Sequence, residues 1–173
     1  KTGLKATELG CGCEAVSDAT VLQRALDLGI NFFDTARQYE GGNSERMLRG
    51  ALGARRKDVI LASRSYGENA RTLQRELDDS LKVLGTDYLD IYYLHLPDWN
   101  TPIEETLAAL DSLVRQGKVR YPASSNYASW QGCEMLWLAE KNGYQPLRIS
   151  QQMYNLLARR LAEPAAQLLA LQH

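Results

Sequence analysis

The sequence predicts an α/β fold with parallel strands, namely a (β/α)8 TIM barrel of which about six of the eight β/α units are represented. Three observations predict it. Segments with helical periodicity end at glycines and are followed within a few residues by strand-like runs. The run at 88–96 has the nearly continuous apolar character of a strand that is buried on both faces of a parallel sheet. Polar residues gather where the runs end, which is where barrels place their ligand sites.

The first half of the chain is expected to alternate regularly between the two kinds of element. Gly29 ends the first helix, because glycine readily adopts the left-handed conformation that stops a helix. In chain order we expect a short strand at 9–13, a helix at 17–28, a strand at 30–36, a short helix at 43–52 and a strand at 58–65.

The second half continues the alternation. Leucines at helical spacing precede Gly85, which predicts a helix and then a strand at 88–96. Thr101, Pro102 and Glu104 match a capping box with proline at the first helical position, which predicts a helix ending at Gly117. A strand at 119–126, a helix at 129–141, a strand at 148–155 and a helical tail at 161–173 complete six strands and six helices.

Two architectures fit this alternation, a doubly wound open sheet and a barrel. A dinucleotide-binding open sheet would carry Gly-x-Gly-x-x-Gly after its first strand, and here the third glycine is missing after Gly10 and Gly12. The barrel is therefore favoured. A full barrel needs about 250 residues, so we interpret residues 1–173 as a single, partial barrel domain. Deletion, disorder, unseen gaps and supply by another chain all remain open for the other units.

The composition is that of an ordinary soluble domain, with 45% hydrophobic and 24% charged residues. The net charge of −1 gives no field that would recruit nucleic acid, and no apolar run is long enough to span a membrane. We therefore expect a small-molecule partner. The three cysteines predict buried hydrophobes rather than a metal site, and a cytoplasmic protein. The chain starts at Lys1 rather than Met, so an export signal upstream stays open.

Polar side chains of different chemistry are predicted to share one rim of the barrel. They are Asp34, Tyr39, Arg64 and His95, followed by Ser125, Asn126 and Gln151. Each has an ordinary alternative: Asp34 could cap backbone donors, Arg64 could merely neutralise Asp34, and His95 could be a core histidine. An acid, a phenol, a cation and an imidazole after three successive strands favour a catalytic site.

The residues around this rim resemble the signatures of the aldo-keto reductase family. Residues 31–36 read Asn-Phe-Phe-Asp-Thr-Ala and are followed by Tyr39 and by Gly-Asn-Ser-Glu-Arg at 42–46. Residues 85–95 look like the second family signature, and 117–121, 125–126 and 150–157 continue the resemblance in order. It covers roughly residues 3–158.

The resemblance implies hydride transfer between a nicotinamide and a carbonyl group. It implies that Tyr39 is the general acid, that His95 orients the carbonyl and that Asp34 holds the cation that tunes Tyr39. Arg64 stands where the family has its catalytic lysine. A guanidinium spreads its charge over a planar fork that prefers bidentate pairing, so we expect reduced or altered turnover with nucleotide binding retained.

The resemblance also implies how the cofactor and substrate are held. Ser125, Asn126 and Gln151 match the residues that bind the nicotinamide carboxamide. NADP is the family's usual cofactor and NAD is possible, since the discriminating contacts belong to strands seven and eight. Tyr66 and Trp99 are candidates for the substrate pocket, although an ordinary place in a loop is equally compatible with both. Trp130 and Trp137 lie on the predicted helix at 129–141 and are expected to pack against the barrel.

Two other functions compete with a carbonyl oxidoreductase. One is a cofactor-binding but weakly active or inactive module for interaction or redox sensing, resembling the auxiliary subunits of potassium channels, which Arg64 keeps open. The other is a metal-dependent hydrolase, which the presence of only His95 and His173 as histidines disfavours. Substrate identity, reaction direction and oligomeric state are left open.

Overall fold

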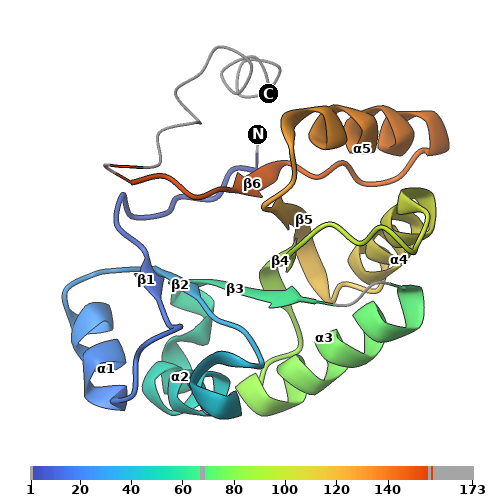
Figure 1. Ribbon diagram of the computed structural model, residues 1–173. Helices are drawn as coiled ribbons and strands as arrows, with labels where there is room; N and C mark the ends of the chain where they lie inside the picture. Colours follow the sequence, from blue (N-terminus) through green and yellow to red (C-terminus); the bar gives the residue numbers. More distant parts are fainter. Residues whose placement is uncertain (1, 67–68, 156, 158–173) are drawn as a thin grey trace.

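The computed structural model describes residues 2–66, 69–155 and 157, which form one sheet of parallel strands alternating with helices (Figure 1). The strands are β1 (Cys11–Gly12), β2 (Phe32–Asp34), β3 (Ile60–Ser65), β4 (Leu89–Leu94), β5 (Val119–Ser125) and β6 (Ile149–Gln151). The helices are α1 (Ala19–Asp27), α2 (Ser44–Leu52), α3 (Ala70–Leu84), α4 (Ile103–Arg115) and α5 (Ser129–Asn142). Two short 3-10 turns, η1 (Tyr39–Gly42) and η2 (Gly53–Asp58), flank α2.

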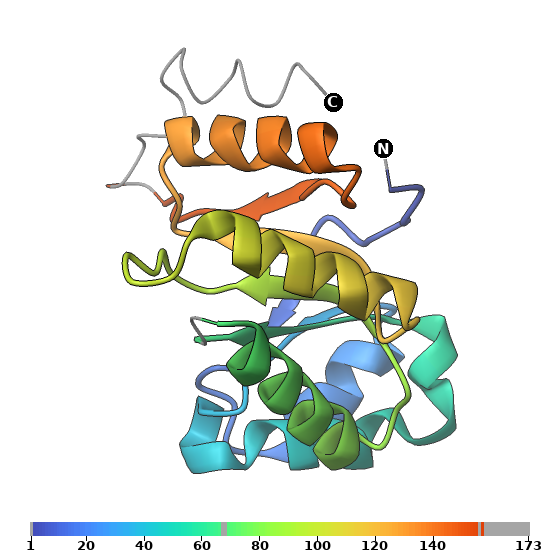
Figure 2. The same cartoon turned by 90° about the vertical axis from the view of Figure 1, so that its right-hand side faces the viewer.

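Each strand pairs in parallel with the next strand in the chain, so the order across the sheet is β1-β2-β3-β4-β5-β6. The sheet curls, and the helices cover its outer face (Figure 1). In the view from the side, α3, α4 and α5 lie on the face of the molecule that is turned toward the viewer (Figure 2). The predicted partial (β/α)8 barrel is therefore confirmed. Among the described residues, no helix is both long and apolar enough to cross a membrane.

Alternation along the strands divides the apolar residues between two layers. One cluster lies between the sheet and its helices and includes Phe33, Leu61 and Tyr92. The smaller cluster lies on the inner face of the curl and includes Ile60 and Ile91, together with Ala62, Tyr93 and Ala123. Side chains along a strand point alternately to opposite faces of the sheet. A residue at the end of a strand that lies an even number of positions from a member of the inner cluster therefore also faces inward. This places the rim residues inside the curl.

A buried charge cluster lies at the other end of the strands. The carboxylate of Asp90 forms an ion pair with Arg56 at 3.0 Å and accepts hydrogen bonds from Arg120 at 2.7 Å and from the backbone N–H of Leu61 at 3.0 Å. The two guanidinium groups also lie 4.2 and 4.1 Å from the centroid of the Tyr88 ring. Only 2% of the Asp90 side chain is exposed. This cluster joins the beginnings of β3, β4 and β5.

Helix ends follow local sequence where a cap is available. Asp18 accepts a 2.8 Å hydrogen bond from the N–H of Thr20 at the start of α1, and Asn69 accepts one of 3.0 Å from Thr72 at the start of α3. Gly85 ends α3 with φ +67°, and a Cβ at this position would lie 2.7 Å from Arg49 Nε. Both the conformation and the contact require glycine.

Replacing Gly85 by alanine is therefore expected to lower the free energy of unfolding by about 1–2 kcal/mol. Gly50 is the matched control, since it lies within α2 and a Cβ there meets nothing within 4 Å. Gly50→Ala should instead stabilise the protein by about 0.5–1 kcal/mol. Urea unfolding followed by circular dichroism measures both changes, and equal effects of the two variants would contradict this account of Gly85.

The start of α4 departs from the prediction. Pro102, not Thr101, is the N-cap residue, and no side chain caps the helix. The predicted capping box is therefore wrong. The reason lies in the preceding loop, where the carboxylate of Asp98 accepts hydrogen bonds from the N–H groups of Asn100 at 2.9 Å and of Thr101 at 3.1 Å. This turn fixes Thr101 outside the helix.

The outer face of α5 also departs from expectation. Trp130 and Trp137 were expected to pack against the barrel, but each is 60% exposed. They lie seven residues apart, opposite the face that buries Met135 and Leu138. Cys133 is exposed on the same side, so only Cys13 is fully buried and Cys11 partly so. The predicted helix at 161–173 lies outside the described residues.

Candidate active site

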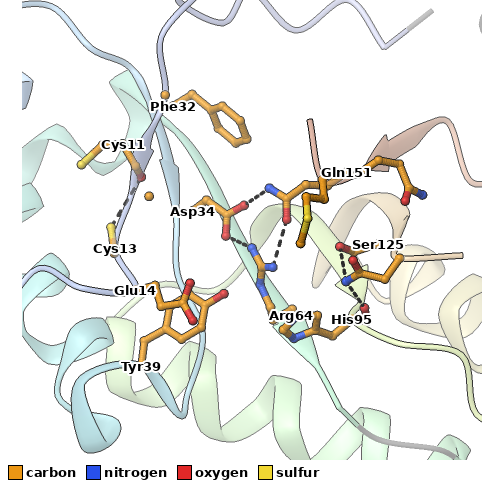
Figure 3. Close-up of a pocket in the computed structure, with 15 residues that line it drawn as sticks. Cys11, Cys13, Glu14, Phe32, Asp34, Tyr39, Arg64, His95, Ser125 and Gln151 are labelled. Carbon is orange, nitrogen blue, oxygen red and sulfur yellow. Dashed lines mark hydrogen bonds and ion pairs between the residues drawn. The ribbon is translucent and has the colours of Figure 1, made fainter. Parts of the chain in front are cut away.

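The curl encloses a cavity of about 470 Å³ at the carboxyl ends of the strands. All the residues predicted to be catalytic or to bind the cofactor line it, namely Asp34, Tyr39, Arg64, His95, Ser125, Asn126 and Gln151. Figure 3 shows most of these side chains converging from β2, β3, β5, β6 and the loops that follow the strands. The fold thus brings together residues that are spread over more than a hundred positions of the sequence.

Asp34, Arg64 and Gln151 form a closed triangle of polar contacts (Figure 3). Arg64 is buried and forms an ion pair with Asp34, and its Nη1 donates to Gln151 Oε1 at 3.0 Å. Gln151 Nε2 in turn donates to the second carboxylate oxygen of Asp34 at 2.5 Å. Among the described residues, the Asp34 carboxylate thus contacts side chains and caps no backbone donor. The planar guanidinium uses its fork to bind two neighbours at once, as its geometry favours.

The phenol of Tyr39 lies in an environment that keeps it protonated. Burial, the largest cause, and the negative charge of Glu14 raise the pKa of Tyr39 to about 12. The Arg64 Cζ atom is 5.5 Å from the centroid of the Tyr39 ring. The guanidinium of Arg64 forms its ion pair with Asp34 and not with Tyr39. The pKa of the phenol is thus shifted away from neutrality, opposite to the shift that assists proton transfer at pH 7.

His95 follows β4 and faces the same cavity. Burial and then the positive charge of Arg64 lower its pKa, so the imidazole is neutral at pH 7. The ring contacts that of Tyr66, with centroids 4.2 Å apart. Within the part of the chain that the structure describes, the buried Nδ1 of His95 has no hydrogen-bond partner. This argues against a satisfied core histidine and leaves a neutral imidazole at the cavity wall.

The three residues predicted to bind the cofactor offer the right chemistry for a carboxamide. An amide group has two N–H donors and an oxygen with two lone pairs. Asn126 uses its donors on the carbonyl of His95 at 2.9 Å and on Ser125 Oγ at 3.1 Å. Gln151 uses one donor and one lone pair in the Asp34–Arg64 triangle. Donors and acceptors remain on these residues, so the set fits a nicotinamide carboxamide.

The two predicted substrate residues lie differently. Tyr66 contacts His95, and Trp99 is 76% exposed in the loop before α4. Neither is among the residues that line the cavity. Their role in substrate binding stays a prediction.

Sequence reasoning missed one charged residue of the site. Glu14 lines the cavity together with Tyr39 (Figure 3). It follows the end of β1, so the same rule that pointed to Asp34 and Arg64 applies to it. Glu14 directly follows the strand expected at 9–13, so the sequence carried the signal that could have identified it.

Comparison with known proteins identifies the family. The sequence model of the aldo/keto reductase family matches residues 9–170. The chain belongs to the aldo/keto reductase family. Human aldo-keto reductase family 7 member A3 is 36% identical over 92% of this chain and 51% of its own length. L-glyceraldehyde 3-phosphate reductase from Escherichia coli is 37% identical over 83% of the chain and 46% of its own length.

A third relative of this aldo/keto reductase chain has a name of a different kind. A probable voltage-gated potassium channel subunit beta from Arabidopsis thaliana is 32% identical over 94% of the chain and 56% of its own length. The chain spans about half the length of the curated relatives it matches. In the described residues, no group of three or more His, Cys, Asp or Glu is placed to hold a metal ion.

Proposed function

We propose that this chain is a nicotinamide-dependent oxidoreductase that interconverts a carbonyl compound and an alcohol, with Tyr39 as the general acid or base. The observation that carries the proposal is the convergence of Tyr39, His95 and the Asp34–Arg64 ion pair on one cavity at the carboxyl ends of the strands. Reductase names among the relatives support the same class of reaction.

Each residue has a distinct part in the proposed reaction. Ser125, Asn126 and Gln151 would hold the carboxamide of the nicotinamide, which supplies the hydride when bound. The neutral imidazole of His95 donates an N–H to the carbonyl oxygen and orients it. Tyr39 donates its phenolic proton to the oxygen as negative charge develops there. Arg64, paired with Asp34, contributes positive charge near the phenol.

The second candidate is a cofactor-binding module with little catalytic activity. Two observations favour it: Arg64 is tied to Asp34 and Gln151, and the pKa of Tyr39 is raised to about 12. The name of the plant relative, a potassium channel subunit, is in keeping with such a role. Mixing the full chain with NADPH separates the candidates. Oxidation of NADPH with a panel of aldehydes supports the enzyme, and binding without oxidation supports the module.

Replacing Tyr39 by phenylalanine is expected to lower kcat by at least about 100-fold, because general acid catalysis typically contributes that much. The affinity for NADPH should be unchanged, since the hydroxyl is assigned to the proton and not to the cofactor. Tyr144→Phe is the matched control, as Tyr144 packs against the outer core away from the cavity. A Tyr39→Phe variant that retains full turnover would contradict the proposed role of the phenol.

The finer assignments remain proposals that separate measurements can test. We propose NADP rather than NAD as the cofactor, and a cytoplasmic location. Dissociation constants for NADPH and NADH, measured by quenching of tryptophan fluorescence, test the choice of cofactor. Tighter binding of NADH would overturn it.

A further inference from the structure

Glu14 brings to the cavity wall a negative charge that forms no ion pair with a described residue. The cavity is lined by two carboxylates, Glu14 and Asp34, and by one guanidinium, Arg64. Arg64 forms its ion pair with Asp34. No hydrogen bond or ion pair joins the Glu14 side chain to any other residue that the structure describes. With His95 neutral, these charged groups leave the cavity with a net negative charge.

The charge of Glu14 acts on the groups that would meet a substrate. It contributes to the raised pKa values of Tyr39 and Tyr66, and it opposes the lowering of the pKa of His95. These three side chains belong to different elements around the cavity. The Glu14 carboxylate is therefore close enough to the reacting region for a charged group on a bound molecule to interact with it. Glu14 itself is exposed, so solvent weakens such an interaction and salt screens it.

We propose that Glu14 determines substrate specificity by charge, favouring carbonyl compounds that carry a cationic group and rejecting those that carry a carboxylate or phosphate. This inference rests on the proposed function, because it assigns the substrate class of the same cavity. An anionic substrate would place its charge near the Glu14 carboxylate, whereas a cationic group would pair with it. The charge of Glu14 should not discriminate between neutral substrates.

Five benzaldehydes of matched shape test the proposal on the full chain. The 4-carboxy compound is compared with neutral 4-nitrobenzaldehyde, and the cationic 4-trimethylammonio compound with neutral 4-tert-butylbenzaldehyde; unsubstituted benzaldehyde is the reference. Calorimetric dissociation constants, with and without NADPH, do not depend on turnover. We expect the wild-type protein to bind the cation about two- to fivefold more tightly and the anion about two- to fivefold more weakly than the neutral partner at low salt.

Glu14→Gln should bring both ratios close to one while leaving the affinity for the neutral compounds unchanged. Glu8→Gln removes the same charge at an exposed position outside the cavity lining and should keep the wild-type ratios. Equal ratios in the wild-type protein and Glu14→Gln would overturn the proposal, and so would weaker binding of all five compounds by Glu14→Gln. Failure of every compound to bind the wild-type protein would overturn it as well.

The same experiment distinguishes this inference from the proposed function. Charge-dependent binding without NADPH oxidation would support the role of Glu14 and contradict the oxidoreductase. Oxidation of NADPH with all five aldehydes at rates that do not depend on their charge would support the oxidoreductase and contradict the role of Glu14.

Discussion

Replacing Arg64 by lysine is expected to raise kcat for aldehyde reduction by about 10- to 100-fold, because it improves general acid catalysis by Tyr39. The guanidinium now binds Asp34 and Gln151 through its planar fork, and its carbon centre lies 5.5 Å from the ring centroid of Tyr39. A lysine ammonium is a compact charge that can pair with Asp34 and also approach the phenol oxygen. Its positive charge favours the phenolate, so the pKa of Tyr39 should fall.

The pH dependence of kcat/KM shows in which direction Arg64→Lys shifts the pKa of Tyr39. With the pKa of Tyr39 raised to about 12, the phenol stays protonated throughout the neutral and mildly alkaline range. The value of kcat/KM for reduction should therefore stay level as the pH rises toward that value. In Arg64→Lys the decline should begin at lower pH, because the phenol loses its proton earlier. Rates of NADPH oxidation across the pH range, with one aldehyde at varied concentration, measure both changes.

Arg55→Lys is the matched control for this substitution. Arg55 forms an exposed ion pair with Asp27 at 2.9 Å, and neither residue lines the cavity. Its replacement should leave kcat and the pH profile as they are. If Arg64→Lys behaved like Arg55→Lys, then Arg64 would not occupy the position of the family's catalytic lysine.

Replacing Asp90 by asparagine is expected to lower the free energy of unfolding by about 3–5 kcal/mol. The Asp90 side chain is 2% exposed and that of Arg56 is 15% exposed, so the substitution leaves a largely buried guanidinium without its counter-charge. Asparagine has only one acceptor oxygen, so it cannot replace both carboxylate oxygens, which contact Arg56, Arg120 and the N–H of Leu61. Because the cluster joins three neighbouring strands, the loss should affect the whole sheet.

Asp27→Asn provides the comparison at the surface. The side chains of Arg55 and Asp27 are 43% and 57% exposed, so breaking their ion pair should cost at most about 1 kcal/mol. Urea unfolding of both variants, followed by circular dichroism, gives the two free-energy changes. A loss of similar size in the two variants would show that burial does not make the Asp90 cluster important for stability.

Local sequence was sufficient for the alternation of strands and helices. Glycines at helix ends, such as Gly85, and apolar spacing within segments depend only on neighbouring residues. The ends of elements were less predictable. The strand expected at 148–155 covers only Ile149–Gln151, and it pairs with a single described neighbour, β5. Because β6 has a described partner strand on one side only, few of the residues in the expected segment form ladder hydrogen bonds.

The candidate site shows the same division. Asp34, Arg64 and His95 were predicted because each follows a strand-like run, and parallel strands end at one rim. Glu14 was missed although it directly follows the strand expected at 9–13, so the same rule applied to it. The exposure of Trp130 and Trp137 was missed because apolar character does not say which side of a helix has a partner.

What the sequence by itself determined is the type of fold and the identity of the polar residues at its rim, since both follow from periodicity and chain order. Only the tertiary structure decided how those residues are paired. Gln151 reaches Asp34 across 117 positions of the chain, and this contact exists because the sheet curls and brings β6 toward β2. Charges and pKa values depend on distance and burial in space, so the charge of Glu14 at the cavity wall and the raised pKa of Tyr39 could emerge only there.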